Sequence, residues 1–184
     1  MNNPLRILQT FDRHLSVPTE MTLFGRAALA LGYPGSHADF AATRDVDVIL
    51  PLSWLAADDE NIDFWQAQQR TNAELEAEGL YLTRLFRELE VILTPDWPTR
   101  RVRLLLEYRR LTVFRPSTLD LILTKMARAD ENDLADIRFL LSQENSSSEQ
   151  LRAAFLRARV PDVPEIQELF QSAQPKVLAL AAVK

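Results

Sequence analysis

Apolar residues along the N-terminal half recur at two spacings, one typical of helices and one typical of strands. Residues 5–11 place apolar side chains at helical intervals and predict a short amphipathic helix. Residues 21–24 predict a buried strand, and the alanine- and leucine-rich residues 26–31 predict a helix. After a loop with turn chemistry, residues 46–50 predict a second strand. We expect the two strands to be neighbours in one sheet, because a single helix and a loop join them.

The rest of the pattern predicts a long helix, further strands and a helical C-terminal third. The helix should begin at the acids of residues 58–60, which favour a first turn, and should stop at Gly79. Strands are expected at residues 88–94, 101–106 and 111–114. Ser117 is the expected N-cap where the helical part opens. The order of elements predicts an α/β (α+β) fold: a mixed sheet flanked by helices at residues 1–115, with a helical region at residues 116–184 packed on it.

Two acids alternate with apolar residues where the second strand begins. Because side chains on a strand alternate between faces, Asp45 and Asp47 should share one face and Val46 and Val48 the other. Two carboxylates on one face repel each other unless a cation lies between them, and Mg²⁺ prefers such oxygen ligands. The pair therefore suggests a magnesium clamp for phosphates. The same spacing also occurs at solvated strand ends, and the pattern alone leaves both interpretations open.

The turn at Gly25 is a second candidate feature. A strand that turns through glycine into a helix exposes unpaired backbone N–H groups, which can bind an anion. Taken by itself, Gly25 is equally typical of an ordinary strand-to-helix turn. A phosphate cradle followed by metal-binding carboxylates on a neighbouring strand is the layout of the nucleotidyltransferase superfamily.

The amino-acid composition excludes some kinds of catalytic and metal-binding site. The chain has 184 residues, 47% of them apolar, which is enough for one core or a core with a small helical appendix. Cysteine is absent and only two histidines occur, so thiolate zinc sites and cysteine nucleophiles are excluded and a Ser-His-Asp triad is disfavoured. The net charge of −5 argues against a large bare nucleic acid, and the arginines of residues 100–103 and 109–110 are more typical of a solvated strand face than of an RNA patch. With no signal-like segment or long apolar run, we expect no membrane association and a cytoplasmic location.

Lys125 and Asp133 are the candidate residues of the C-terminal third. The helix after Ser117 carries an apolar stripe and ends near Lys125, and the next helix has Asp133 and Asp136 on its polar side. A lysine at a helix C-terminus and an acid in a first turn both interact favourably with the helix dipole. From the residues alone, those structural roles are the preferred explanation.

The chain resembles bacterial nucleotidyltransferase-fold proteins related to the AbiEii-type toxin of abortive-infection and toxin–antitoxin systems. The similarity covers roughly residues 20 to 142 and preserves the order of the motifs. The segments that carry it are residues 23–31, 43–48, 93–102, 120–126 and 133–137. The resemblance implies a nucleotidyltransferase-like mixed sheet and an Mg²⁺- (or Mn²⁺-) dependent reaction with a nucleoside triphosphate as substrate.

The resemblance also implies roles for individual residues. Asp45 and Asp47 would hold the metal, and Lys125 and Asp133 would complete the catalytic set. The nucleotide would be bound around Gly25, Arg26, Thr43 and Arg44.

Three departures from the family pattern affect the expected activity. Arg26 stands where the family usually has a second small residue, and it could either bind phosphate or close the cradle. Ala41 stands where active relatives often carry an arginine, for which Arg44 would substitute only in part. A third metal-binding carboxylate belongs on a later strand, and Glu107, on the same predicted face as Arg103 and Leu105, is the best candidate, although it could equally be a turn residue.

The resulting hypothesis is transfer of a nucleoside monophosphate from a nucleoside triphosphate to a protein, an RNA end or a small molecule. An antitoxin or operon partner is the candidate protein partner. The alternative is a catalytically degenerate module of the same fold that binds nucleotides or a partner protein, and a third interpretation is an unrelated α/β domain. The transferase hypothesis also predicts that Lys125 faces Asp45 and Asp47 across a pocket.

Overall fold

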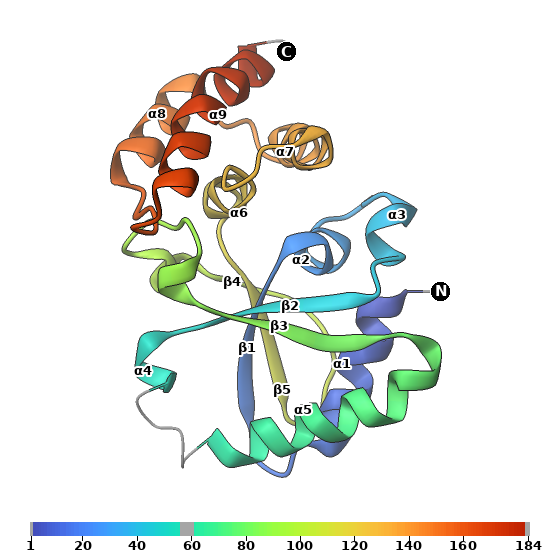
Figure 1. The fold of residues 1–184 in the computed structure, drawn as a ribbon. Helices are drawn as coiled ribbons and strands as arrows, with labels where there is room; N and C mark the ends of the chain where they lie inside the picture. Colours follow the sequence, from blue (N-terminus) through green and yellow to red (C-terminus); the bar gives the residue numbers. More distant parts are fainter. Residues whose placement is uncertain (1, 56–60, 183–184) are drawn as a thin grey trace. The chain divides into compact units, whose positions relative to one another are not determined.

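The chain forms two compact units that interleave along the sequence (Figure 1). The computed structural model describes residues 2–55 and 61–182. The first unit comprises Met1–Arg87 and Arg101–Arg115, and the second comprises Glu88–Arg100 and Pro116–Lys184. All strands of the sheet belong to the first unit, and the long C-terminal helices belong to the second.

The first unit is built on a five-stranded mixed sheet with the order β3-β2-β1-β5-β4. Its strands are β1 (Thr19–Phe24), β2 (Asp45–Leu50), β3 (Tyr81–Arg87), β4 (Val102–Arg103) and β5 (Leu111–Arg115). β1 pairs antiparallel with β2 and parallel with β5, β2 pairs parallel with β3, and β4 pairs antiparallel with β5. The expected α/β class with a mixed sheet is confirmed, as is the adjacency of the first two predicted strands.

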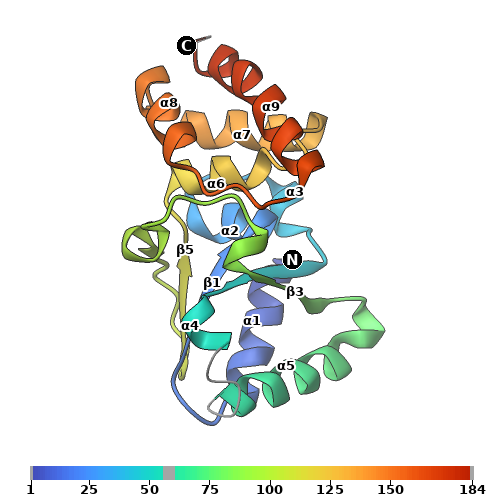
Figure 2. The same ribbon diagram turned by 60° about the vertical axis from the view of Figure 1, so that its left-hand side comes forward.

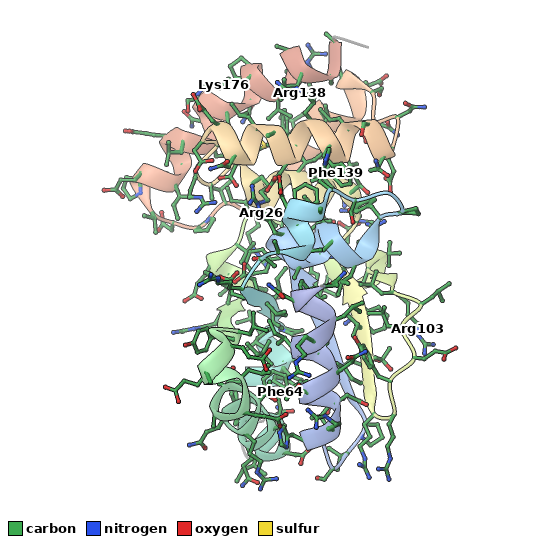
Figure 3. All side chains as sticks on the ribbon, turned by 90° about the vertical axis from the view of Figure 1, so that its right-hand side faces the viewer. Arg26, Phe64, Arg103, Arg138, Phe139 and Lys176 are labelled. Atoms are coloured by element: carbon green, nitrogen blue, oxygen red, sulfur yellow. The ribbon has the colours of Figure 1, made fainter. Side chains whose placement is uncertain are left out.

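Helices cover both faces of this sheet. They are α1 (Asn3–His14), α2 (Gly25–Gly32), α3 (Ala38–Ala41), α4 (Leu52–Leu55) and α5 (Ile62–Leu75), followed by the 3-10 turn η2 (Glu76–Glu78). α1 and α5 lie side by side, with Phe64 of α5 in edge contact with Phe11 of α1 and Trp54 of α4 (Figure 3). Gly79 ends the helical stretch in a left-handed conformation, as predicted, while the predicted start at residues 58–60 lies outside the described residues.

One of the predicted strands is wrong, and another is shorter than predicted. Residues 88–94 contain the 3-10 turn η3 (Glu88–Glu90), and the strand lies earlier, at Tyr81–Arg87. Residues Val91, Ile92 and Leu93 are apolar because they are buried in the second unit, and a short apolar run cannot by itself distinguish a strand from other buried backbone. The predicted strand at residues 101–106 is reduced to the two residues of β4. One further bond joins Leu104 to Val113, and Leu106 then bonds back to Leu104 in a tight turn.

The second unit is a helical bundle with one extended segment (Figure 2). Its helices are α6 (Thr118–Lys125), α7 (Glu131–Gln143), α8 (Ser148–Arg157) and α9 (Pro164–Ala182). α6 packs on α7 and α8, and α9 packs on the same two helices. Ser117 caps α6 as predicted, by accepting a hydrogen bond from the backbone N–H of Asp120. The segment 88–100, with the 3-10 turn η4 (Trp97–Arg100), joins this bundle through a bridge between Leu93 and Arg159.

Within the described residues, no helix combines the length and apolar character that crossing a membrane would require.

Candidate functional site

The turn from β1 into α2 brings a carboxylate against the backbone. Gly25, the first residue of α2, has a φ of +64°, a left-handed conformation that glycine adopts without strain. A Cβ added to Gly25 would lie 2.6 Å from Oδ2 of Asp47. No other residue could leave that space open, so the side chain of Asp47 lies directly beside the N-terminal turn of α2. The glycine turn and the acidic strand, which are separate features in the sequence, are therefore adjacent in the first unit.

The alternation along β2 presents both acids on one face. Asp45 and Asp47 are partly exposed, whereas Val46 and Val48 are buried, as predicted. The register of the sheet pairs Asp47 with Phe24, the residue that precedes the glycine turn. Neighbouring strands are only about 5 Å apart, and this pairing therefore explains why the carboxylate reaches the turn.

A hydrogen bond fixes the first acid of the pair. The hydroxyl of Thr43 donates to Oδ1 of Asp45 over 2.8 Å, two residues away along the chain. A carboxylate oxygen can accept further bonds, so this contact orients Asp45 without using all of its lone pairs. Thr43 thus supports the acid on which the predicted metal site depends.

The sheet is irregular beside these acids. β2 pairs with β3 in register at Val46 and Leu82, but the next pair is Asp47 and Arg84, so Thr83 is an extra residue on β3. Such bulges bend a strand and increase its twist, and they are frequent next to active sites. The position of this bulge, between Val46 and Asp47, was not expected from the sequence.

Of the two arginines predicted to bind nucleotide, Arg26 directly follows Gly25 in the sequence and Arg44 directly precedes Asp45. Arg26 directs its guanidinium toward α3, where its Cζ lies 5.8 Å from the centre of the Phe40 ring. Arg44 is exposed, and its carbonyl accepts a hydrogen bond from the backbone N–H of Tyr81, which ties the start of β2 to β3.

Glu107 lies outside the strands, in the connection from β4 to β5. It is exposed and lines a cavity of about 480 Å³ beside α1, together with Arg6, Arg13 and Glu74. In the described part of the chain, no three His, Cys, Asp or Glu side chains gather closely enough to hold a metal ion. Glu107 is therefore not brought together with Asp45 and Asp47 into a three-carboxylate set.

Lys125 and Asp133 meet inside the second unit. Nζ of Lys125 lies 3.3 Å from Oδ1 of Asp133 and 2.6 Å from Oδ2 of Asp136. All three side chains are almost fully buried, although Asp133 and Asp136 were expected on the polar side of their helix. Buried charges are stable only when they are paired in this way. In the sequence, a buried ion pair could have been predicted from a lysine followed by two acids that are three residues apart.

A second cation joins this cluster. Nε and a terminal nitrogen of Arg128 donate to the two oxygens of Asp133 over 3.0 and 3.1 Å. The hydrogen bond to Asp133 raises the pKa of the Arg128 guanidinium.

The turn between α6 and α7 passes through Ala129 with a φ of +51°, an uncommon conformation for a residue other than glycine. The sequence also predicts that Lys125 faces Asp45 and Asp47 across a pocket. Lys125 belongs to the second unit and the two acids to the first, and this placement stays a prediction.

Sequence reasoning missed the most completely buried acid of the second unit. Asp120 has no exposed surface and accepts hydrogen bonds from the backbone N–H and the hydroxyl of Thr94, at 2.9 and 2.8 Å. Arg100 adds an ion pair at 3.0 Å, and the hydroxyl of Ser117 a hydrogen bond at 2.6 Å. The capping spacing of Ser117 and Asp120 was visible in the sequence, but the partners from residues 94 and 100 were not.

The donor set of the first unit fits a magnesium ion. Mg²⁺ in phosphate-transferring sites is held by one or two protein carboxylates together with substrate phosphates. Asp45 and Asp47 provide two partly exposed carboxylates on one strand face, and Gly25 keeps the adjoining backbone accessible. Within the described residues, these are the side chains that could hold the metal predicted from the sequence.

Comparison with known proteins identifies the family. The model of a family of nucleotidyltransferases of unknown function (DUF6036) matches residues 6–167, and the chain therefore belongs to this family. No curated protein and no solved structure matches the chain.

Proposed function

We propose that this member of the nucleotidyltransferase family transfers a nucleoside monophosphate from a nucleoside triphosphate to an acceptor, with Mg²⁺ or Mn²⁺ as cofactor. In the reaction, an oxygen of the acceptor forms a bond to the α-phosphorus, and the bond from that phosphorus to pyrophosphate breaks. The family assignment supports the reaction class. The choice of metal, nucleotide and site residues is our inference from this chain.

One observation carries the proposal: the Asp47 carboxylate lies against Gly25 at the turn from β1 into α2. A nucleotide bound here would place its phosphates within reach of both a helix N-terminus and a carboxylate pair. The backbone N–H groups of the turn would donate to phosphate oxygens. Asp45, oriented by Thr43, and Asp47 would hold the metal, which when bound neutralises phosphate charge and polarises the reacting phosphorus.

Lys125 and Asp133 enter the proposal only through the resemblance to AbiEii-type proteins. In that branch they contribute to the active site, and in this chain they form a buried ion pair. Glu107, which lies beside α1 and apart from Asp45 and Asp47, is not part of the proposed metal site. The relation to AbiEii-type toxins, an antitoxin or operon partner and a cytoplasmic location are likewise proposals. The acceptor would be a protein, an RNA end or a small molecule.

Label transfer tests the proposal directly. The purified chain is incubated with each α-³²P-labelled nucleoside triphosphate, Mg²⁺ or Mn²⁺ and a bacterial cell extract, and labelled species are separated by size. We expect a labelled product with the wild type and a loss of about 100-fold or more with Asp45→Asn plus Asp47→Asn, because the metal-binding charge is removed. A matched control replaces two exposed acids of α9, Glu165→Gln plus Glu168→Gln, and should label as the wild type does. Undiminished labelling by the Asp45/Asp47 variant contradicts the proposal.

Arg26 favours a specific alternative, a nucleotide-binding or partner-binding module without catalysis. It occupies the second position of a turn where the resemblance leads us to expect a small residue, and its guanidinium points toward Phe40. Binding of a non-hydrolysable nucleotide with Mg²⁺, measured by calorimetry, separates the two functions. Binding without transfer, together with a gain of transfer in Arg26→Gly, supports the degenerate module. Transfer by the wild type excludes it.

A further inference from the structure

The edge strand β4 is shorter than the strand that the sequence predicts. Residues 101–106 carry the alternating pattern of a strand, but only Val102 and Arg103 pair with β5. Beyond them Leu104 still donates its N–H to the carbonyl of Val113 over 2.8 Å, and the chain then leaves the sheet. β4 is an edge strand of the sheet, and β5 pairs with only one of its two sides.

The open side of β4 presents unused backbone groups. In an antiparallel pair, residues that exchange hydrogen bonds alternate with residues whose N–H and C=O point the other way. Leu104 bonds to β5, so the neighbouring Arg103 directs its N–H and C=O to the open edge. Within the described residues, no other segment pairs with this edge.

The side chains of this edge combine apolar surface with positive charge. Leu105 is 96% exposed and Val102 is 40% exposed. Arg103 is exposed, lies on the outer side of the sheet in Figure 3, and forms no ion pair within the described part of the chain. Arg101 differs, because its guanidinium is fixed by an ion pair with Glu20 and lies 4.3 Å from the centre of the Phe114 ring.

The charge of the edge selects its partner. Residues 101–110 contain four arginines and one acid, Glu107. A second copy of the chain adding its own β4 would place arginine beside arginine, and like charges on paired strands repel. An acidic strand would instead gain both backbone hydrogen bonds and opposite charge.

From these observations we propose that the open edge of β4 binds an extended acidic segment of a partner protein by strand addition. Arg103 and Leu105 lie two residues apart and therefore on one face of the strand. The bound segment should accordingly carry an acid opposite Arg103 and, two residues along, an apolar residue opposite Leu105. Pairing extends β4 through residues 104–106, and the backbone hydrogen bond from Leu106 to the carbonyl of Leu104 opens as the strand forms. This interaction is independent of the transferase reaction.

Designed peptides test this interaction on the full chain. The probe is a fluorescein-labelled decapeptide with glutamate and valine alternating on one face and threonine on the other. One matched peptide has lysine in place of each glutamate, and a second carries N-methyl groups on alternate backbone nitrogens. Fluorescence anisotropy should show binding of the acidic probe only, because lysine repels the arginines and N-methylation removes the strand hydrogen bonds. Hydrogen exchange of the Arg103 amide should slow when the acidic probe is bound.

Two charge reversals complete the test. Arg103→Glu should weaken binding of the acidic probe about tenfold and improve binding of the lysine probe. Arg138→Glu, an exposed arginine of α7, changes the net charge equally and should leave both affinities unchanged. Equal effects of the two reversals, binding of the N-methylated peptide, or no binding of the acidic probe would each overturn the proposal. Both variants should show the thermal unfolding of the wild type, since neither arginine has an ion-pair partner in the described residues.

Discussion

One pair of acids in the first unit and one acid in the second are used in opposite ways. Asp45 and Asp47 lie partly exposed on a strand face, and one of them lies against the turn at Gly25. Asp120 is completely buried and is surrounded by the donors of Thr94, Arg100 and Ser117. A carboxylate whose lone pairs are all taken by the protein can hold a fold together but cannot take up a ligand. Partial exposure beside a glycine turn, rather than the presence of acids, is what marks the first unit as the place of a candidate site.

Asp120→Ala should have the largest effect on stability. It leaves the N–H of Thr94 without its acceptor and removes the buried ion-pair partner of Arg100, which keeps only the more exposed Asp96, and this should cost about 3 kcal/mol. Chemical denaturation followed by circular dichroism measures the change. Asp130→Ala, at the exposed N-cap of α7, is the comparison and should cost clearly less. Equal losses for the two variants would mean that Asp120 is no more important than an ordinary cap.

Gly25→Ala should damage the candidate site more than the fold. Its Cβ would overlap Oδ2 of Asp47 at 2.6 Å, and its φ of +64° adds a strain of about 1 kcal/mol. The control is Gly35→Ala, which has a φ of +72° but no atom within 4 Å of the added Cβ. Both variants should lose similar stability, while nucleotide binding should weaken about tenfold or more only in Gly25→Ala. Similar binding by the two variants would separate the glycine turn from the site.

Thr43→Val should produce a smaller loss at the same site. The substitution removes the hydroxyl that donates to Asp45 and leaves a side chain of similar size. Since one hydrogen bond is worth about 1 kcal/mol, transfer activity should fall about fivefold. Thr43→Ser keeps the hydroxyl and should retain most of the activity. A serine variant as impaired as the valine variant would assign the effect to packing of the methyl group instead.

Asp63→Asn should show the smallest effect and a defined dependence on pH. Burial opposes ionisation of this carboxyl, but hydrogen bonds from Ser16 and Val17 outweigh it and lower the pKa of Asp63. Because the folded pKa is the lower one, the charged carboxylate stabilises the fold above the unfolded pKa of about 4, and this contribution is lost as pH falls through the folded pKa.

The variant should therefore be less stable than the wild type by about 0.5 kcal/mol at pH 7, because these hydrogen bonds are exposed to solvent, and the difference should shrink below about pH 4. Thermal unfolding across this pH range measures it. A difference that stays constant down to pH 2 would exclude the carboxylate charge as the cause.

The sequence by itself determined the elements that depend on local pattern. Alternation fixed the faces of Asp45 and Asp47, glycine marked the turn into α2 and the end of the helix before β3, and Ser117 marked the start of α6. Each of these rests on backbone geometry or on contacts a few residues long, which the identity of the residues controls directly.

Tertiary structure decided the rest, because the deciding partners are far apart in the sequence. The apolar run in residues 88–94 is typical of a strand, yet its side chains at residues 91–93 are buried in the helical unit. Asp120 gains its role from Thr94 and Arg100, and Asp47 reaches Gly25 only because β1 and β2 pair with Phe24 opposite Asp47. The identity of an apolar residue indicates that it favours burial, and that of an acid that it needs solvent or a partner when buried. Which neighbours each residue contacts is determined by the packed fold.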